Sequence, residues 1–78
     1  MRQDLRMDEV VVAAHAAMAA RDWVGLRPML HPYLHWIALD GEVLRGRNNV
    51  LAMLEQVDVP APPTIVELRD RQIYRWRA

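Results

Sequence analysis

Helical spacing of apolar residues opens the chain and returns in its middle. Between residues 5 and 20 apolar side chains recur every three or four positions, a pattern that places them on one face of an α-helix. The alanine-rich composition of this stretch also favours helix. Asp22 can then cap a second, short helix, which Pro28 limits in length. After Gly46, the i, i+3, i+4, i+7 pattern that starts at Val50 predicts a third helix.

Two segments, which begin at Tyr33 and Thr64, change to the alternation typical of β-strands. In the first segment Asp40-Gly41 is a strong signal for a two-residue hairpin turn. Such a turn sets Trp36 opposite Arg45 and decides which side chains share a face. One face is predicted to carry Leu34, Trp36, Ala38, Val43 and Arg45, and the other to carry Tyr33, His35, Ile37, Leu39 and Leu44.

The second hairpin follows the proline-rich connector DVPAPPT and is predicted to turn at Asp70-Arg71. This turn places Glu67 opposite Tyr74, with Trp76 on the same face. The exact pairing depends on the register, because a slip of one residue reverses every side chain.

Neither face of either hairpin is purely polar, which indicates a sheet covered on both sides. We therefore expect an α+β fold in which three helices pack on the concave face of a small, curved antiparallel sheet. A partner chain is expected on the other face. Residues 1–78 are expected to form a single domain, and a chain of this length buries only roughly 60–65% of its unfolded surface. Association with another chain is a common way to stabilise so small a core.

The amino-acid composition excludes several kinds of binding partner and reactive site. Ten basic and ten acidic residues cancel, so no net charge attracts nucleic acid or an anionic membrane. The chain contains no Cys, Ser or Lys, which excludes thiolate metal sites, serine and cysteine nucleophiles and Schiff-base lysines. No apolar run approaches the ~20 residues of a membrane span. The sequence thus predicts a cytoplasmic protein without a metal or a cofactor.

Three ordered segments carry a resemblance to a known family. They are AARDWVGLRPMLHPYLHW, DGEVLRGRNNVLAML and VELRDRQIYRW. Together they resemble the nuclear transport factor 2-like superfamily, and in particular its SnoaL-like branch of small bacterial proteins. The resemblance implies a cone-like fold around an apolar pocket, with pairing through the convex face of the sheet. It also implies a biosynthetic role as a cofactor-independent isomerase, cyclase, dehydratase or hydrolase, if the protein is an enzyme.

Two departures from the family pattern bear on function. Longer members place further strands where this chain has only DVPAPPT, so we expect a reduced strand count and a shallow or one-sided cone. The tyrosine and aspartate positions of the superfamily's steroid isomerases fall on Ala14 and Ala38, and alanine cannot transfer protons. Enolisation of that kind is therefore not supported.

Three residues are candidates for acid–base chemistry. His15 lies at the edge of the first apolar helix face, where it is either a general base or a rim histidine held by a neighbour. Glu67 and Tyr74 are either a proton-transferring pair beside aromatic rings or an exposed cross-strand pair. Both interpretations stay open for each residue.

Apolar and aromatic residues from the predicted inner faces make up the candidate pocket. They are Ala14, Met18, Trp36, Ala38, Val43, Arg45 and Trp76. Trp36 is either a pocket wall or core, and Arg45 is either an anion clamp or a cation–π partner of Trp36. His31 and His35 do not form a metal pair, because Pro32 and the strand keep them off a shared helix face.

The convex face of the first hairpin is the predicted dimer surface. Tyr33, His35, Ile37 and Leu44 form a set too apolar to leave in water, so we expect a homodimer with two-fold symmetry. Three function classes stay open: an enzyme acting on a small apolar metabolite, a non-catalytic ligand-binding module, and a homodimerising interaction domain. A buried ionisable group in a cavity favours the first, an apolar cavity the second, and no cavity the third.

Overall fold

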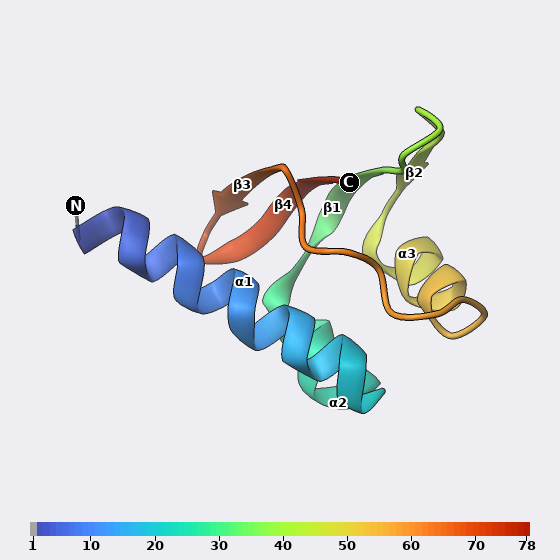
Figure 1. The fold of residues 1–78 in the computed structure, drawn as a ribbon, viewed down its shortest axis with the longest axis horizontal. Helices are drawn as coiled ribbons and strands as arrows, with labels where there is room; N and C mark the ends of the chain where they lie inside the picture. Colours follow the sequence, from blue (N-terminus) through green and yellow to red (C-terminus); the bar gives the residue numbers. More distant parts are fainter. Residues whose placement is uncertain (1) are drawn as a thin grey trace.

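A computed structural model describes the backbone of residues 2–78 and the side chains from Glu9 onward. The elements in chain order are α1 (Arg2–Ala20), α2 (Trp23–Leu26), the 3-10 helix η1 (Arg27–Met29), β1 (Leu30–Ile37), β2 (Val43–Arg45), α3 (Arg47–Leu54), β3 (Ile65–Arg69) and β4 (Gln72–Arg77). The helices lie on one side of the sheet, as predicted (Figure 1). The Met7 side chain, part of the predicted apolar helix face, lies outside the described side chains.

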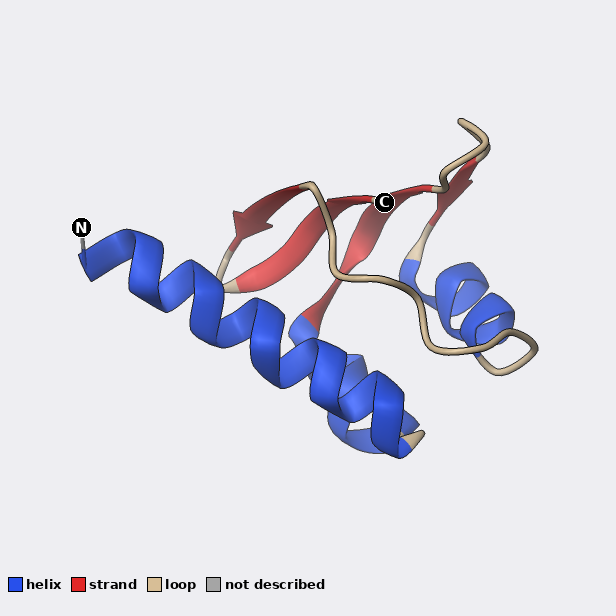
Figure 2. Ribbon diagram, viewed as in Figure 1, coloured by secondary structure: helices blue, strands red, loops and turns tan. Residues whose placement is uncertain are grey.

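The four strands form one sheet in the order β2-β1-β4-β3. Each hairpin is antiparallel, as predicted, but β1 and β4 pair in parallel at the centre of the sheet. The sheet is therefore mixed and open rather than wholly antiparallel (Figure 2). The α+β architecture of three helices on a small sheet is confirmed; the parallel pair was missed because it joins segments about forty residues apart, and local spacing does not report it.

The junction between α1 and α2 follows the predicted capping. Arg21 has a positive φ of 56°, and its N–H donates to the Met18 carbonyl while the N–H of Asp22 donates to the Ala17 carbonyl. These two bonds end α1 in a Schellman motif. The Asp22 carboxylate then accepts from the N–H of Gly25 at 3.0 Å and caps α2, as expected. No helix within residues 2–78 combines the length and the apolar character needed to cross a membrane.

The first hairpin has a longer loop than predicted. Ile37 lies opposite Val43, and the N–H of Gly41 donates to the Ala38 carbonyl, so the loop has three residues rather than two. Gly41, with a φ of 88°, supplies the left-handed residue that such a loop needs. The predicted register was wrong by one residue, which reverses the facing of every residue on β2.

The second hairpin turns where it was predicted to turn. Asp70 and Arg71 both have positive φ, as a two-residue type I′ turn requires. A β-bulge follows on β4, because Leu68 pairs with Ile73 while Glu67 pairs with Arg75. The bulge turns Ile73 and Trp76, three residues apart, to the same buried side of the sheet.

One row of side chains crosses the helix-covered face of all four strands. Register partners Leu44, Trp36, Trp76 and Val66 make up this inner row. The rings of Trp36 and Trp76 stack with centroids 5.0 Å apart and planes 6° from parallel. Helix residues Ala14, Met18, Val50 and Leu54 belong to the same buried cluster. The core therefore lies between the inner row and the three helices.

Removing the Trp36 ring should destabilise the fold strongly. Trp36 is 4% exposed, and large-to-small aromatic changes in cores cost about 3–5 kcal/mol. Total stabilities of domains are only about 5–15 kcal/mol, so Trp36→Ala should remove a large share of the free energy of unfolding. Urea unfolding followed by circular dichroism measures the loss.

Leu39→Ala is the matched control, because Leu39 lies at the tip of the same hairpin and is 86% exposed. Its cost should stay below about 1 kcal/mol, as for most surface changes. Equal unfolding midpoints for the two variants would contradict the core role of Trp36.

Candidate functional site

Among the described side chains, the interior between sheet and helices is apolar except for two buried nitrogen atoms, Arg47 Nε and Trp76 Nε1. No polar or charged residue is among the buried side chains from Glu9 onward. Neither of these two nitrogen atoms has a hydrogen-bond partner in that part of the chain, and the tryptophan stack is held by apolar contact. No histidine, carboxylate or tyrosine is among the fully buried residues of this described interior, so it contains no general acid or base.

A shallow hollow of about 110 Å³ opens beside the tryptophan stack. Its lining residues are Trp36, Ala38, Asp40, Glu42, Leu44 and Met53. Leu44 reaches this face because of the three-residue loop, and Met53 comes from α3. The loop adds two carboxylates at the edge of an otherwise apolar wall.

The predicted pocket residues divide into three groups. Ala14, Met18, Trp36 and Trp76 are buried members of the core. Ala38 lines the hollow, next to Trp36, which also lines it. Val43 and Arg45 were assigned to the wrong face, because the shifted register sets them opposite Ile37 and His35. Arg45 is thus not the cross-strand neighbour of Trp36; the register partners of Trp36 are Leu44 and Trp76.

Two rows of register partners make up the face away from the helices, here called the outer face. One row consists of Arg45, His35, Arg75 and Glu67, and the other consists of Val43, Ile37, Arg77 and Ile65. Tyr33 shares this face and is 72% exposed. Leu44, predicted here, lies on the inner row instead, for the same reason of register.

Histidine and tyrosine rings cluster around Tyr74 at the bulge. His31 meets the Tyr74 ring edge-on at 5.1 Å, and His35 lies 5.3 Å from the same ring. The guanidinium of Arg69 lies 4.1 Å from the centre of the Tyr74 ring, within cation–π range. The bulge brings Tyr74 and Arg75 together on the outer face, which explains how β4 contributes both.

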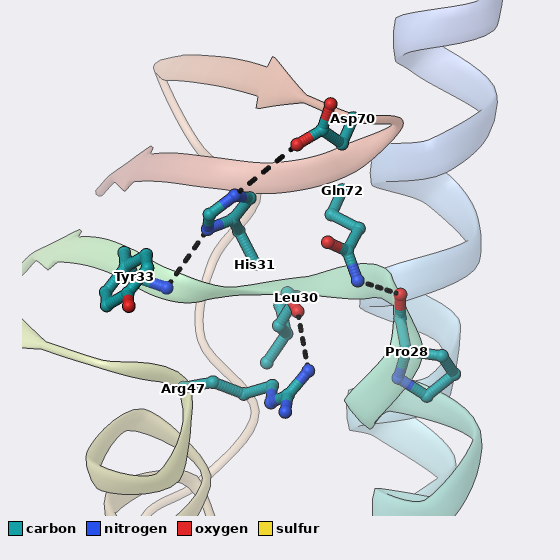
Figure 3. Close-up of polar contacts among 7 residues, drawn as sticks. All are labelled: Pro28, Leu30, His31, Tyr33, Arg47, Asp70 and Gln72. Atoms are coloured by element: carbon teal, nitrogen blue, oxygen red, sulfur yellow. Dashed lines mark hydrogen bonds and ion pairs between the residues drawn. The ribbon is translucent and has the colours of Figure 1, made fainter.

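His31 is held in one orientation by its neighbours (Figure 3). Its Nδ1 accepts from the N–H of Tyr33 at 3.0 Å, and its Nε2 lies 3.8 Å from an Asp70 oxygen. An acceptor Nδ1 leaves the proton of the neutral ring on Nε2, which faces the carboxylate. Gln72, on the other side of the turn, donates to the Pro28 carbonyl at 2.9 Å and ties β4 to η1.

The three acid–base candidates are not brought together. His15 is half-buried on α1, and its Nε2 lies 2.8 Å from the Pro60 carbonyl of the connector. Glu67 pairs with Arg75 at 3.4 Å on the outer face, not with Tyr74. Tyr74 lies beneath Arg69 and beside the two histidines. The geometry therefore offers no joint site for proton transfer among these residues.

Sequence reasoning missed four residues of the hollow: Asp40, Glu42, Leu44 and Met53. The available signal was the Leu39-Asp40-Gly41 stretch, which is equally compatible with a three-residue loop ending in a left-handed glycine. Among the described side chains, no group of three or more His, Asp or Glu residues is placed to hold a metal ion.

Comparisons with known proteins agree with this geometry. A family profile for the SnoaL-like domain matches residues 7–77. An NTF-2-like protein of unknown function from Burkholderia xenovorans LB400 has a similar structure, with a TM-score of 0.71 at 15% identity over 96% of this chain and 82% of that one. A candidate ketosteroid isomerase from Kribbella flavida DSM 17836 gives a TM-score of 0.76 at 12% identity over 90% of this chain and 73% of that one.

No curated protein matches the chain. At identities this low the two structures establish a shared fold and nothing about activity. The profile match covers nearly the whole sequence, and the helices and mixed sheet agree with both structural neighbours. The chain therefore belongs to the SnoaL-like domain family and has the NTF-2-like fold.

Proposed function

We propose that this chain is a homodimerising interaction domain whose copies meet through the outer face of the sheet. The observation that carries the proposal is the apolar content of that face. Tyr33 is 72% exposed, Ile65 51% and Val43 47%. Ile37 lies in the same row, paired with Val43 on one side and with Arg77 on the other, and Arg77 in turn pairs with Ile65. Apolar side chains gathered on one open sheet face favour contact with another protein surface.

The filled interior weighs against an enzyme. Trp36 and Trp76 occupy the centre of the concave face, where a substrate of a deeper cone would lie. His15, Glu67 and Tyr74 are dispersed over the connector side and the outer face. Acid–base turnover of a metabolite would need at least one of them beside a cavity.

Association with a second copy would also add to the limited apolar surface that so small a domain buries by itself. Chains of this size bury a modest share of their surface, and oligomerisation is one of the few ways to add apolar burial without disulfides or metals. The chain has no cysteine. A two-fold axis through the outer face would let each copy cover the other's Tyr33 and Val43 at once.

The net positive charge of the outer face weakens the proposed association of two copies. The arginines are Arg45, Arg69, Arg75 and Arg77, and the carboxylates are Glu67 and Asp70. This excess of positive charge opposes its own copy, so apolar contact must supply the attraction and added salt should assist it by screening.

A glutamate in place of Val43 should weaken the dimer. Two-fold symmetry brings two buried carboxylates into the contact for each substitution, and desolvation of charge is costly. The wild-type chain should sediment at equilibrium as twice its 9.1 kDa mass at micromolar concentration, and Val43→Glu should raise the dimer dissociation constant at least about tenfold.

Val24→Glu is the matched control, because Val24 is 86% exposed on α2, away from the sheet, and its variant should dimerise like the wild type. Circular dichroism confirms that each variant stays folded. A wild-type monomer that remains folded at neutral pH would refute the proposal.

The hollow beside Trp36 supports a second candidate function, the binding of a small apolar ligand. Its wall of Trp36, Ala38, Leu44 and Met53 is apolar and lies at the edge of the filled interior. An apolar concavity with a few polar groups at its rim is the usual form of a small-ligand site.

Filling the hollow should abolish such binding. A neutral probe of matching size, 3,3-dimethylbutan-1-ol, should shift the Met53 methyl and Trp36 indole signals in NMR titrations, and Ala38→Leu should remove the saturable shift. Ala52→Leu, on the exposed side of α3 and outside the lining, should leave it intact. The absence of any saturable shift in the wild type would exclude this second function.

A further inference from the structure

We infer that the two copies of the proposed dimer are related by a two-fold axis that runs along the strands, so that β2 of each copy lies over β3 of the other. The inference rests on the proposed homodimer and names the side chains that meet in it. Arg45 of each copy meets Glu67 of the other, and Val43 of each copy meets Ile65 of the other.

The two rows of the outer face differ in what they place at the edges of the sheet. β2 and β3 are the edge strands and lie at opposite sides of the sheet (Figure 1). The first row begins with an arginine on β2, Arg45, and ends with a carboxylate on β3, Glu67. The second row begins and ends with apolar residues, Val43 and Ile65, which are 47% and 51% exposed. One row therefore changes the sign of its charge from edge to edge, and the other is apolar at both edges.

The shape of this pattern favours two sheets with aligned strands. Neighbouring strands lie about 4.8 Å apart, so a row that crosses four strands is about 14 Å long. The two rows are two residues apart along each strand, which separates them by about 7 Å. Two sheets that crossed at right angles would overlap only in the middle of such an elongated pattern and would leave both edges uncovered. An axis along the strands or across them keeps the strands aligned.

An axis along the strands matches the edges of the two copies. It sets β2 of one copy over β3 of the other and keeps each row over the same row. Arg45 then meets Glu67 of the other copy, where opposite charges attract at short range. Val43 meets Ile65 of the other copy, and both apolar side chains leave water. Two-fold symmetry repeats each contact at the other edge.

The middle of the face is compatible with the same axis, which sets β1 of one copy over β4 of the other. Arg77 would meet Ile37 of the other copy, on which the apolar stem of an arginine can lie while its charge reaches solvent. Arg75 would meet His35 of the other copy, and Glu67 lies 3.4 Å from Arg75 within its own chain and offsets its charge. Within the two rows no arginine faces an arginine.

An axis across the strands gives a poorer match. It sets every strand over its own counterpart and exchanges the two rows. Arg45 would then cover Val43 of the other copy, and Arg75 would face Arg77 of the other copy. A charge covered without a partner and a contact between like charges are both costly. The net positive charge of the face opposes association in either arrangement, so the pattern of the rows decides between them.

Two double variants of equal net charge test the pairing of Arg45 with Glu67. Glu67→Arg alone should raise the dimer dissociation constant about tenfold, because arginines would meet at both edges. Addition of Arg45→Glu restores opposite charges across the axis and should return the constant to within about threefold of the wild-type value. Addition of Arg69→Glu instead, on β3 but outside both rows, restores only the net charge and should leave the dimer weak.

Sedimentation equilibrium measures each dissociation constant, and circular dichroism checks that each variant is folded. Both double variants lose the ion pair between Glu67 and Arg75, so this loss cannot explain a difference between them.

Cross-linking gives a second measurement that changes no charge. The chain has no cysteine, so Val43→Cys and Ile65→Cys each introduce one thiol at an exposed position. Packed sheets lie about 10 Å apart, a gap that a short bis-maleimide spans. A mixture of the two variants should give a cross-linked species of twice the 9.1 kDa mass, whereas either variant alone should give little.

The outcomes separate the orientation from the dimer itself. Equal dissociation constants for the two double variants, or no effect of Glu67→Arg, would overturn the orientation while the homodimer remains. Efficient cross-linking of Val43→Cys to its own copy would overturn it as well, because residues 43 of the two copies would then lie at the same edge. If the wild-type chain stays monomeric, the proposed function fails together with the inference.

Discussion

The stack of Trp36 on Trp76 is the contact on which the rest of the fold depends. Each hairpin closes locally, but the two hairpins become one sheet only through the parallel pair of β1 and β4. Forming that pair closes a loop of about forty residues, which costs chain entropy before any contact repays it. The stacked rings are register partners near the C-terminal ends of these two strands, and both are buried there. The helices then pack on a surface that the two tryptophans define.

The helices, the strands and the fold class could be predicted from the sequence. The register of β2 and the pairing of β1 with β4 could not. Periodicity located the helices, the Asp22 cap and the Asp70-Arg71 turn. The first hairpin loop has one residue more than predicted. Because side chains alternate along a strand, this places Leu44 on the helix-covered face and Val43 and Arg45 on the outer face, the reverse of the prediction. The bulge at Tyr74 left a readable trace: Ile73 and Trp76 are both large and apolar but lie three positions apart, which a regular strand cannot bury on one side. The parallel pair left no local trace at all.

Register also explains why chemistry and packing lie on separate faces. The inner row consists of Leu44, Trp36, Trp76 and Val66. Its neighbours along each strand are polar or half-exposed, so the arginines, His35 and Glu67 gather on the outer face. The core occupies the helix-covered side of the sheet, where the two tryptophans stack. The exposed arginines lie on the outer face, and Asp40 and Glu42 lie at the edge of the core.

The connector between α3 and β3 gives a structural reason for the presence of His15, which the sequence offered as a candidate general base. Strands satisfy one another's carbonyls through their ladders. Residues 55–64 have no such ladder, so their carbonyls need other donors. Arg21 donates to the Glu55 carbonyl at 2.8 Å, and His15 Nε2 lies 2.8 Å from the Pro60 carbonyl. The prolines lower the entropy lost when this segment is fixed. His15 on α1 thus lies within hydrogen-bond distance of a connector carbonyl outside the sheet, and this contact gives the residue a structural role.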